Sequence, residues 1–254
     1  MSGAYPKVAL ITGAAKRIGA EIARKLHAAN FNIIAHYHQS KADAEELAEE
    51  LNEKRSESAI SIQADLNDMS QVMHLAQAGS DAWQKIDLLV NNASSFFPTP
   101  IGKTDEEEWN QIINSNLKAP FFLAQALAPT LAKHHGCIIN IADIYADKPL
   151  KKHSVYSIAK AGNVMLTKTL ALELAPLIRV NGIAPGAILW PDDSYKKPED
   201  QLSDENKQKM LAKIPLQERG HESDIARTIL FLANEAPYMT GQILNVDGGR
   251  SITI

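Results

Sequence analysis

The sequence has very little cysteine, since Cys137 is the single one among 254 residues. One cysteine excludes an internal disulfide and a zinc cluster held by cysteines, and its place in an apolar segment indicates a small core residue. No apolar run reaches the roughly 20 residues of a membrane-spanning helix. The start of the chain lacks a basic segment followed by an apolar one. We therefore expect a soluble, cytoplasmic protein with no metal site.

The chain also lacks an excess of positive charge. Its formal net charge is −4, which gives no support for binding to nucleic acid or to an anionic membrane. The apolar fraction of 45% is ordinary for a globular protein. A length of 254 residues is compatible with one large α/β domain, and we expect that single domain to cover residues 1–254.

Seven short apolar segments alternate with about six stretches of helical periodicity. The segments span residues 8–11, 32–36, 61–64, 86–90, 139–142, 179–184 and 243–246. Uninterrupted apolar runs suit parallel strands that are buried on both faces. The pattern predicts an α/β fold with one doubly wound, Rossmann-type parallel sheet of seven strands, helices on both faces and ligand sites at the carboxyl ends of the strands. Residues 187–212 are expected to form a substrate lid.

A glycine turn follows the first strand and leads into a helix. It runs from Thr12 through Gly13, Arg17 and Ile18 to Gly19. In this context backbone amides and a helix N-terminus can face a phosphate, and Arg17, in place of the usual middle glycine, can add a charge-assisted contact. We expect the turn to bind the phosphates of a dinucleotide. The alternative is a tight strand–helix turn without a ligand.

The end of the second strand carries no acidic residue. In a dinucleotide-binding fold an acid there binds the ribose 2′-hydroxyl of NAD and disfavours a 2′-phosphate. Here His38, Gln39 and Ser40 offer hydrogen-bond donors, and Arg17 is expected close by. This composition favours NADPH, and the alternative is a polar loop of accidental composition.

The third and fourth strands also end in residues suited to a ligand. Asp65 can accept from the adenine amino group while Leu66 covers a ring face, although Asp65 can equally cap the next helix. Phe96 and Phe97 follow the fourth strand in a loop punctuated by proline. They are either plugs of the core or, at the carboxyl edge of a sheet, a stacking surface for a flat ligand.

Tyr156 and Lys160 lie four positions apart, on one face of a predicted helix with Ser154 as its N-cap. An ammonium beside a phenol lowers the phenol pKa, which is ordinarily about 10. With the carboxylate of Asp143 arriving from a strand end, the pair is a candidate proton-handling device, and the alternative is an ordinary pair on a helix surface. Asn116, inside another helical pattern, predicts a local irregularity or a bound water.

With these motifs in place, the chain resembles the short-chain dehydrogenase/reductase family over essentially its whole length. The matching residues are Thr12, Gly13, Gly19, Asn91, Asn92, Ala93, Asn116, Tyr156, Lys160, Pro185, Gly186, Asp247, Gly248 and Gly249. The resemblance implies that Tyr156 donates a proton, that Lys160 holds the nicotinamide ribose and lowers the Tyr156 pKa, and that Asn116 supports a water-linked proton path. It also implies a homotetramer and cofactor contacts from Asn92, Ala93, Ser94, Pro185 and Gly186.

Asp143 stands where most members of that family have a serine. An ionised aspartate cannot donate to a substrate carbonyl oxygen and repels a developing alkoxide, but it can serve a basic ring nitrogen. The pteridine reductases have aspartate there, an arginine in the glycine turn and an Asn-Ala-Ser-Ser-Phe segment. The chain is similar to them at Asp143, Arg17 and 92–96. Dihydromonapterin reductases share these features, and Gln39 departs from the arginine of well-studied relatives.

The resemblance implies NADPH-dependent reduction of a pterin such as dihydrobiopterin, dihydromonapterin or a folate. A planar pterin is expected between the nicotinamide and Phe96, with Tyr156 giving a proton to a ring nitrogen. Ser94, Arg17 and Asp143 are expected to contact the substrate, the first two also the cofactor. One alternative is a carbonyl or 3-oxoacyl reductase, against which Asp143 argues. Another is a non-catalytic NADP-binding regulator, against which the intact proton relay argues.

Overall fold

The computed structural model describes residues 6–189 and 203–253. Within these ranges it contains one sheet of seven parallel strands in the order β3-β2-β1-β4-β5-β6-β7. The strands are β1 (Lys7–Ile11), β2 (Phe31–Tyr37), β3 (Ala59–Gln63), β4 (Leu88–Asn91), β5 (Cys137–Ile141), β6 (Arg179–Pro185) and β7 (Ile243–Val246). The predicted seven-stranded parallel sheet is therefore confirmed. Because the strand order reverses beside β1, the crevice expected of a doubly wound sheet lies between the loops after β1 and β4.

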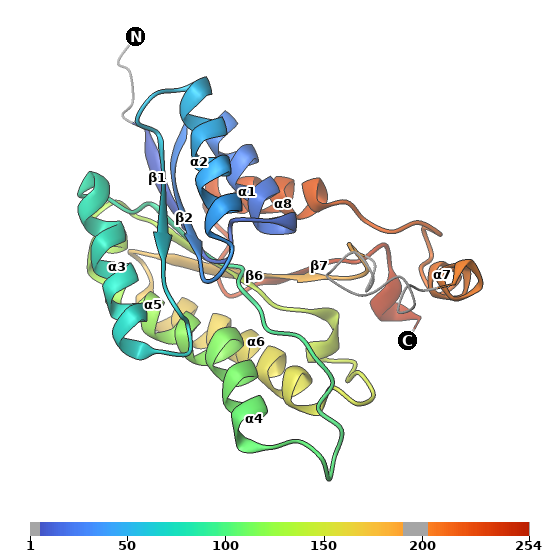
Figure 1. Cartoon of the computed structure of the whole chain (residues 1–254). Coiled ribbons are helices and arrows are strands. Elements are labelled where there is room, and N and C mark those ends of the chain that lie inside the picture. The colour runs from blue at the N-terminus through green and yellow to red at the C-terminus, as the bar shows by residue number, and fades with distance from the viewer. Residues whose placement is uncertain (1–5, 190–202, 254) are drawn as a thin grey trace.

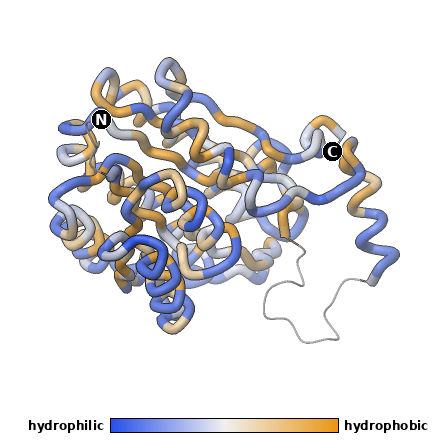
Figure 2. Tube along the Cα trace, turned by 90° about the horizontal axis from the view of Figure 1, so that it is seen from above, coloured by the Kyte–Doolittle hydropathy of each residue, from blue (hydrophilic) through white to orange (hydrophobic). Residues whose placement is uncertain are grey.

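Helices cover both faces of the sheet, as Figure 1 shows. On one face lie α1 (Arg17–Ala28), α2 (Lys41–Lys54) and α8 (Glu222–Asn234). On the other lie α3 (Met69–Trp83), α5 (Ala119–Lys133) and α6 (Ser154–Leu174), with α4 (Glu106–Ile113) leading into α5. A separate cluster of buried apolar side chains fills each of the two layers. Figure 2 shows hydrophobic stretches along the strands and mixed polarity around the helices.

The strands bury both of their faces, which explains why they lack polar alternation. All seven residues of β2 are buried, as are four of the five residues of β1. Cys137 begins β5 with 3% of its surface exposed, and burial raises the pKa of its thiol to about 11. The interpretation of Cys137 as a small core residue is confirmed.

Two helical predictions differ in detail from the structure. The long pattern that contains Asn116 is interrupted by a π-helix, Asn114–Lys118, between α4 and α5, so the irregularity predicted at Asn116 is confirmed. The prediction of Ser154 as an N-cap is wrong, because His153 holds the N-cap position of α6 and Ser154 is the first helical residue.

The predicted lid is described only in part. Its residues 190–202 lie outside the described ranges. The later part contains α7 (Asp204–Leu211), a polar helix without a buried residue, which lies beside the C-terminal end in Figure 1. None of the helices in the described ranges has the length and apolar character needed to cross a bilayer.

Candidate active site

The glycine turn after β1 is shaped by the loop after β4. Gly13 has a φ of +64°, a conformation that favours glycine, and a Cβ at Gly19 would overlap the carbonyl oxygen of Gly13. Asn92 Nδ2 donates to the carbonyl oxygens of Thr12 at 2.9 Å and Gly13 at 3.1 Å. A Cβ on Gly13 would come within 3.0 Å of Ala93 Cα. Asn92 and Ala93 therefore position the turn, and positions 13 and 19 both require glycine because a Cβ there would meet neighbouring backbone atoms.

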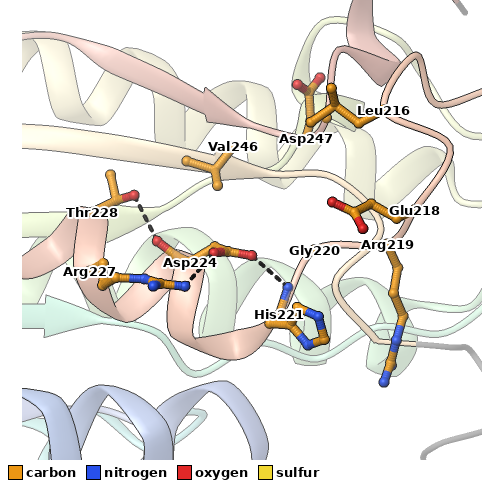
Figure 3. Close-up of a pocket in the computed structure, with 11 residues that line it drawn as sticks. Leu216, Glu218, Arg219, Gly220, His221, Asp224, Arg227, Thr228, Val246 and Asp247 are labelled. Atoms are coloured by element: carbon orange, nitrogen blue, oxygen red, sulfur yellow. Dashed lines mark hydrogen bonds and ion pairs between the residues drawn. The ribbon is translucent and has the colours of Figure 1, made fainter.

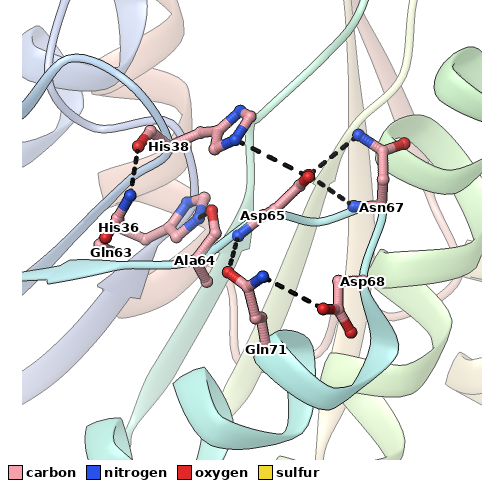
Figure 4. A network of polar contacts seen from close by, with 8 residues as sticks. All are labelled: His36, His38, Gln63, Ala64, Asp65, Asn67, Asp68 and Gln71. Carbon is pink, nitrogen blue, oxygen red and sulfur yellow. Dashed lines mark hydrogen bonds and ion pairs between the residues drawn. The ribbon is translucent and has the colours of Figure 1, made fainter.

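His36 ties the same turn to β2 and to the end of β3. Its Nδ1 accepts from the backbone N–H of Gly13 at 3.0 Å. Its Nε2 lies 3.0 Å from the carbonyl oxygen of Ala64, to which it donates, and Figure 4 shows His36 beside Ala64. These two bonds require the neutral tautomer with its proton on Nε2. Burial lowers the His36 pKa from 6.5 to about 4, so the ring is neutral at physiological pH. Sequence reasoning gave this residue no role in the turn.

Donor side chains gather beside the turn, where β2 ends. Arg17 begins α1 with a φ of +55° and is exposed. His38 and Gln39 are exposed, and Ser40 holds the N-cap position of α2 without a side-chain capping bond. His38 Nε2 lies 3.7 Å from Asp65 Oδ2. Among the described residues, the side chains of Arg17, Gln39 and Ser40 have no hydrogen-bond or ionic partner, so they are available to a ligand.

Asp65 shapes the loop after β3, and Figure 4 shows its contacts. Its Oδ1 accepts from both the backbone N and the Nδ2 of Asn67 at 2.9 Å. The alternative of Asp65 as the helix cap is wrong, because Asp68 is the N-cap of α3 and accepts from Ser70 N at 2.8 Å. Leu66 belongs to the apolar cluster between α3 and the sheet, and 6% of its surface is exposed. Contacts of Asp65 and Leu66 with adenine stay predictions.

Tyr156, Asp143 and Lys160 meet at the carboxyl end of β5. The phenol of Tyr156 donates to Asp143 Oδ2 at 2.7 Å, and Asp143 Oδ1 accepts from the backbone N–H of Tyr145 at 2.8 Å. Lys160 Nζ donates to the carbonyl oxygen of Ile141 at 2.8 Å and lies 5.6 Å from the Tyr156 ring centroid. Tyr156 is 5% exposed and Lys160 2%. The alternative of an ordinary pair on a helix surface is therefore wrong.

The electrostatics of this group differ from the expectation. Burial lowers the Lys160 pKa to about 8, and burial raises the Asp143 pKa. The Tyr156 pKa is raised well above 10 by burial and by the facing carboxylate. The predicted lowering of the Tyr156 pKa by Lys160 is thus wrong for the protein alone, because the ammonium donates to Ile141 rather than to the phenol. The phenol consequently retains its proton at neutral pH.

Asn116 connects α6 to the loop after β4. It is 1% exposed, its Oδ1 accepts from Ser94 Oγ at 2.7 Å, and its Nδ2 donates to the carbonyl oxygens of Ser95 and Ile112, both at 3.0 Å. Its own carbonyl oxygen accepts from Asn163 Nδ2 at 3.0 Å. Sequence reasoning missed Asn163. The available signal was a second asparagine three positions after Lys160, on the buried side of α6.

The two phenylalanines of that loop have different roles. Phe97 is partly buried and packs against the apolar cluster that includes Tyr156, so it is a plug of the core. Phe96 is 52% exposed. Its ring stacks on His153 with centroids 4.7 Å apart and meets the Tyr156 ring edge-on at 4.8 Å. Phe96 therefore presents aromatic surface directly beside the phenol, next to His153, another residue that sequence reasoning missed.

The ends of β6 and β7 complete the carboxyl edge. Pro185 is the last residue of β6 and pairs with Val246, and Gly186 N donates to the Val246 carbonyl oxygen at 2.9 Å. A Cβ on Gly186 would lie 2.6 Å from the Cβ of Asp247. The two predicted residues therefore sit at the edge, packed against the turn after β7.

A cavity of about 490 Å³ opens beside this turn, between β7 and the start of α8 (Figure 3). Asp224 accepts from the backbone N–H of His221 at 2.7 Å and from Arg227 Nη2 at 2.8 Å. The walls of the cavity contain both basic and acidic side chains: Arg219, His221, Arg227, Glu218, Asp224 and Asp247. This mixture gives the cavity no preference for a ligand of one charge.

Comparison with known proteins agrees with this geometry. A family model described as enoyl-(acyl carrier protein) reductase matches residues 13–251. Pteridine reductase 1 of Leishmania tarentolae is 38% identical, covering 97% of this chain and 96% of that protein. The 3-oxoacyl-(acyl-carrier-protein) reductase of Staphylococcus aureus (strain Mu50 / ATCC 700699) is 37% identical, with 96% and 97% covered. The corresponding reductase of Synechocystis is 35% identical, with 98% of each chain covered. The chain belongs to the short-chain dehydrogenase/reductase family of oxidoreductases.

Proposed function

We propose that the protein is an NADPH-dependent pterin reductase. The observation that carries the proposal is the hydrogen bond from the Tyr156 phenol to Asp143 Oδ2, 2.7 Å long. A carboxylate there accepts hydrogen bonds and disfavours negative charge on a neighbouring oxygen. A substrate that becomes an alkoxide is poorly served by it, whereas a heterocycle whose ring nitrogen takes up a proton is well served.

The residues at the carboxyl edge fit a dinucleotide. The glycine turn leads into the N-terminus of α1, where an anion is favourable. The donors of Arg17, Gln39 and Ser40 have no partner among the described residues, and no acid ends β2 to disfavour a 2′-phosphate. Pro185, Gly186 and Ser94 would lie against the nicotinamide end. NADPH, when bound, supplies the hydride.

The proton is supplied by the chain. Tyr156 keeps its phenolic proton at neutral pH because burial and Asp143 raise its pKa, and it is aimed by its bond to Asp143. Lys160 would hold the nicotinamide ribose and, by moving its ammonium toward the phenolate, would stabilise the charge left after proton transfer. Asn116, held in the π-helix, accepts a hydrogen bond from Ser94 Oγ and would support return of the proton.

Phe96 gives the site its preference for a flat substrate. More than half of its surface is exposed, at 52%, and its ring lies in a T-shaped arrangement with the Tyr156 ring. A planar ring stacked on Phe96 would therefore present its nitrogens to the phenol. Ser94 and Arg17 would contact the substrate or the cofactor phosphates.

We also expect a homotetramer. Large apolar side chains are exposed on α5 and α6, including Phe121 at 40%, Met165 at 58% and Leu172 at 82%. Exposed apolar surface of this kind is typical of association between subunits. Sedimentation of the purified protein measures the number of chains.

An assay of NADPH oxidation tests the proposed function. Dihydrobiopterin, dihydromonapterin and dihydrofolate are compared with a 3-oxoacyl thioester and a panel of ketones, because 3-oxoacyl reductases are 37% identical relatives. We expect turnover of at least one pterin and little turnover of the ketones. Reduction of the thioester without any pterin activity would replace the proposal by a 3-oxoacyl reductase.

A further inference from the structure

A second cavity, of about 330 Å³, adjoins the catalytic group. Its walls are Tyr145, Lys148, Pro149, Leu150, Lys213 and Arg250. One of these residues is bonded directly to the site, because Tyr145 N donates to Asp143 Oδ1 at 2.8 Å. Leu150 N donates to Ser157 Oγ at 3.2 Å, on the residue that follows Tyr156 in α6. The cavity therefore shares a wall with the place where Asp143 and Tyr156 meet.

All charged side chains in the described wall of this cavity are cationic. Lys148, Lys213 and Arg250 have no ion-pair partner among the described residues. The nearby carboxylate of Asp247 is engaged with the backbone N–H groups of Gly249 at 2.9 Å and Ser251 at 2.7 Å. The three cations around this cavity repel one another. The carboxylate of Asp143 interacts electrostatically with Arg250 and offsets part of that repulsion, and a bound anion would relieve it further. The cavity of Figure 3 differs, because both acidic and basic side chains line it.

Arg250 is held in place and yet incompletely bonded. Its Nη2 donates to the Tyr145 hydroxyl at 3.0 Å, and its guanidinium lies 5.8 Å from the Tyr145 ring centroid. Its Nε is buried without a hydrogen-bond partner. The bond and the ring contact with Tyr145 fix the direction of the guanidinium, so its charge stays beside the cavity that Lys148 and Lys213 also line.

We propose that this cavity binds an anionic group at the end of the substrate's side chain, a carboxylate or a phosphate, held by Lys148, Lys213 and Arg250. The inference rests on the proposed function, since the planar ring would occupy the neighbouring space beside Phe96 and Tyr156. A volume of about 330 Å³ is at the small end of ligand pockets, which suits a tail rather than a whole substrate. The site accordingly selects pterins with a charged tail over those with a neutral one.

The test compares pterins that differ in tail charge. Dihydrofolate carries two carboxylates, dihydroneopterin monophosphate carries a phosphate, and dihydrobiopterin has a neutral tail. The variant is Lys148→Gln with Lys213→Gln, and the control is Lys133→Gln, at the end of α5 just before β5 begins and thus at the opposite edge of the sheet. We expect the ratio of kcat/KM for a charged pterin to that for dihydrobiopterin to fall about tenfold or more in the double variant. The control should leave the ratio unchanged, and whichever charged pterin shows the fall identifies carboxylate or phosphate.

A binding measurement separates this inference from the proposed function. N-(4-aminobenzoyl)-L-glutamate carries the charged tail without a pterin ring, and its binding is measured by calorimetry with wild type and the double variant. If dihydrobiopterin is reduced but neither the ratio nor the calorimetric affinity changes in the double variant, the anion subsite is wrong and the reductase stands. If no pterin is reduced, the proposed function fails and the calorimetric result alone decides the subsite.

An acidic protein partner is the remaining outcome to exclude. Binding of acyl carrier protein that is lost in the double variant, with no binding of N-(4-aminobenzoyl)-L-glutamate to wild type, would overturn the proposal. Thermal unfolding of each variant confirms that it is folded before its kinetics are compared.

Discussion

The Tyr156 phenol donates a hydrogen bond of 2.7 Å to Asp143 Oδ2, and the other oxygen of that carboxylate accepts the backbone N–H of Tyr145. Both oxygens of Asp143 are thereby fixed, one toward the phenol and one toward its own loop. A serine at this position could offer a hydroxyl proton to a substrate oxygen, which the ionised carboxylate cannot do. Under the proposed function, we therefore expect this side chain to favour a pterin over a ketone as substrate.

Asp143→Ser should lower pterin reduction by about 10²- to 10⁴-fold, the usual contribution of a positioned acid–base group. The carboxylate is needed to orient Tyr156 and the ring nitrogen during protonation. Ser and Asp differ little in size, so the variant should fold, and thermal unfolding checks this. Unchanged pterin turnover would mean that the substrate does not need the carboxylate, and a carbonyl reductase would become the better interpretation.

Tyr156→Phe should abolish nearly all turnover while NADPH still binds. The phenol supplies a proton and little binding energy, so the loss should fall on kcat rather than on KM. Steady-state kinetics combined with a fluorescence titration of NADPH separate the two effects. A variant that keeps a tenth of the wild-type rate would show that another group protonates the substrate.

NADPH should bind at least tenfold more tightly than NADH, a difference of about 1.4 kcal/mol. The donors of Arg17, Gln39 and Ser40 have no partner among the described residues, and no acid ends β2. Arg17→Gln should reduce the preference, whereas Lys25→Gln, in the last turn of α1, is the matched control. Equal affinity for both dinucleotides in wild type would contradict the prediction.

The sheet and the meeting of Asp143 with Tyr156 could be predicted because both follow from local patterns. Uninterrupted apolar runs identify strands buried on two faces, and parallel strands bring their carboxyl ends to one edge. The four-residue spacing of Tyr156 and Lys160 places both on one side of α6. These features need no knowledge of which loops pack together.

The parts that escaped prediction depend on packing between distant segments. Phe96 and Phe97 are adjacent and chemically identical, yet only the loop path after β4 decides that Phe97 packs inward and Phe96 stays exposed. The direction in which the Tyr156 pKa shifts depends on burial and on the partner of the Lys160 ammonium, which is the carbonyl oxygen of Ile141. Spacing along a helix gives neither quantity.

His36 shows the same limit and leads to the last prediction. It lies inside an apolar strand, and only the fold brings its Nδ1 to the backbone N–H of Gly13 in the glycine turn. Protonation of Nδ1 would place a second donor against that N–H and break the bond. The turn that we expect to bind the cofactor phosphates would then lose its link to β2.

The pKa of His36 is lowered by burial from 6.5 to about 4. Below pH 6.5 the unfolded chain therefore binds a proton that the folded protein does not, and the free energy of unfolding should fall as the pH drops from 6.5 toward 4. A difference of this size corresponds to about 3 kcal/mol.

His36→Gln keeps an amide donor and acceptor but does not titrate. This variant should be less stable than wild type at pH 7. Between pH 6.5 and pH 4, however, its free energy of unfolding should fall by about 3 kcal/mol less than that of wild type. Urea unfolding at a series of pH values measures the difference, with the exposed His134→Gln as the matched control. Parallel losses in wild type and His36→Gln would show that the folded protein accepts a proton on His36 as readily as the unfolded chain, and that burial does not hold the ring neutral.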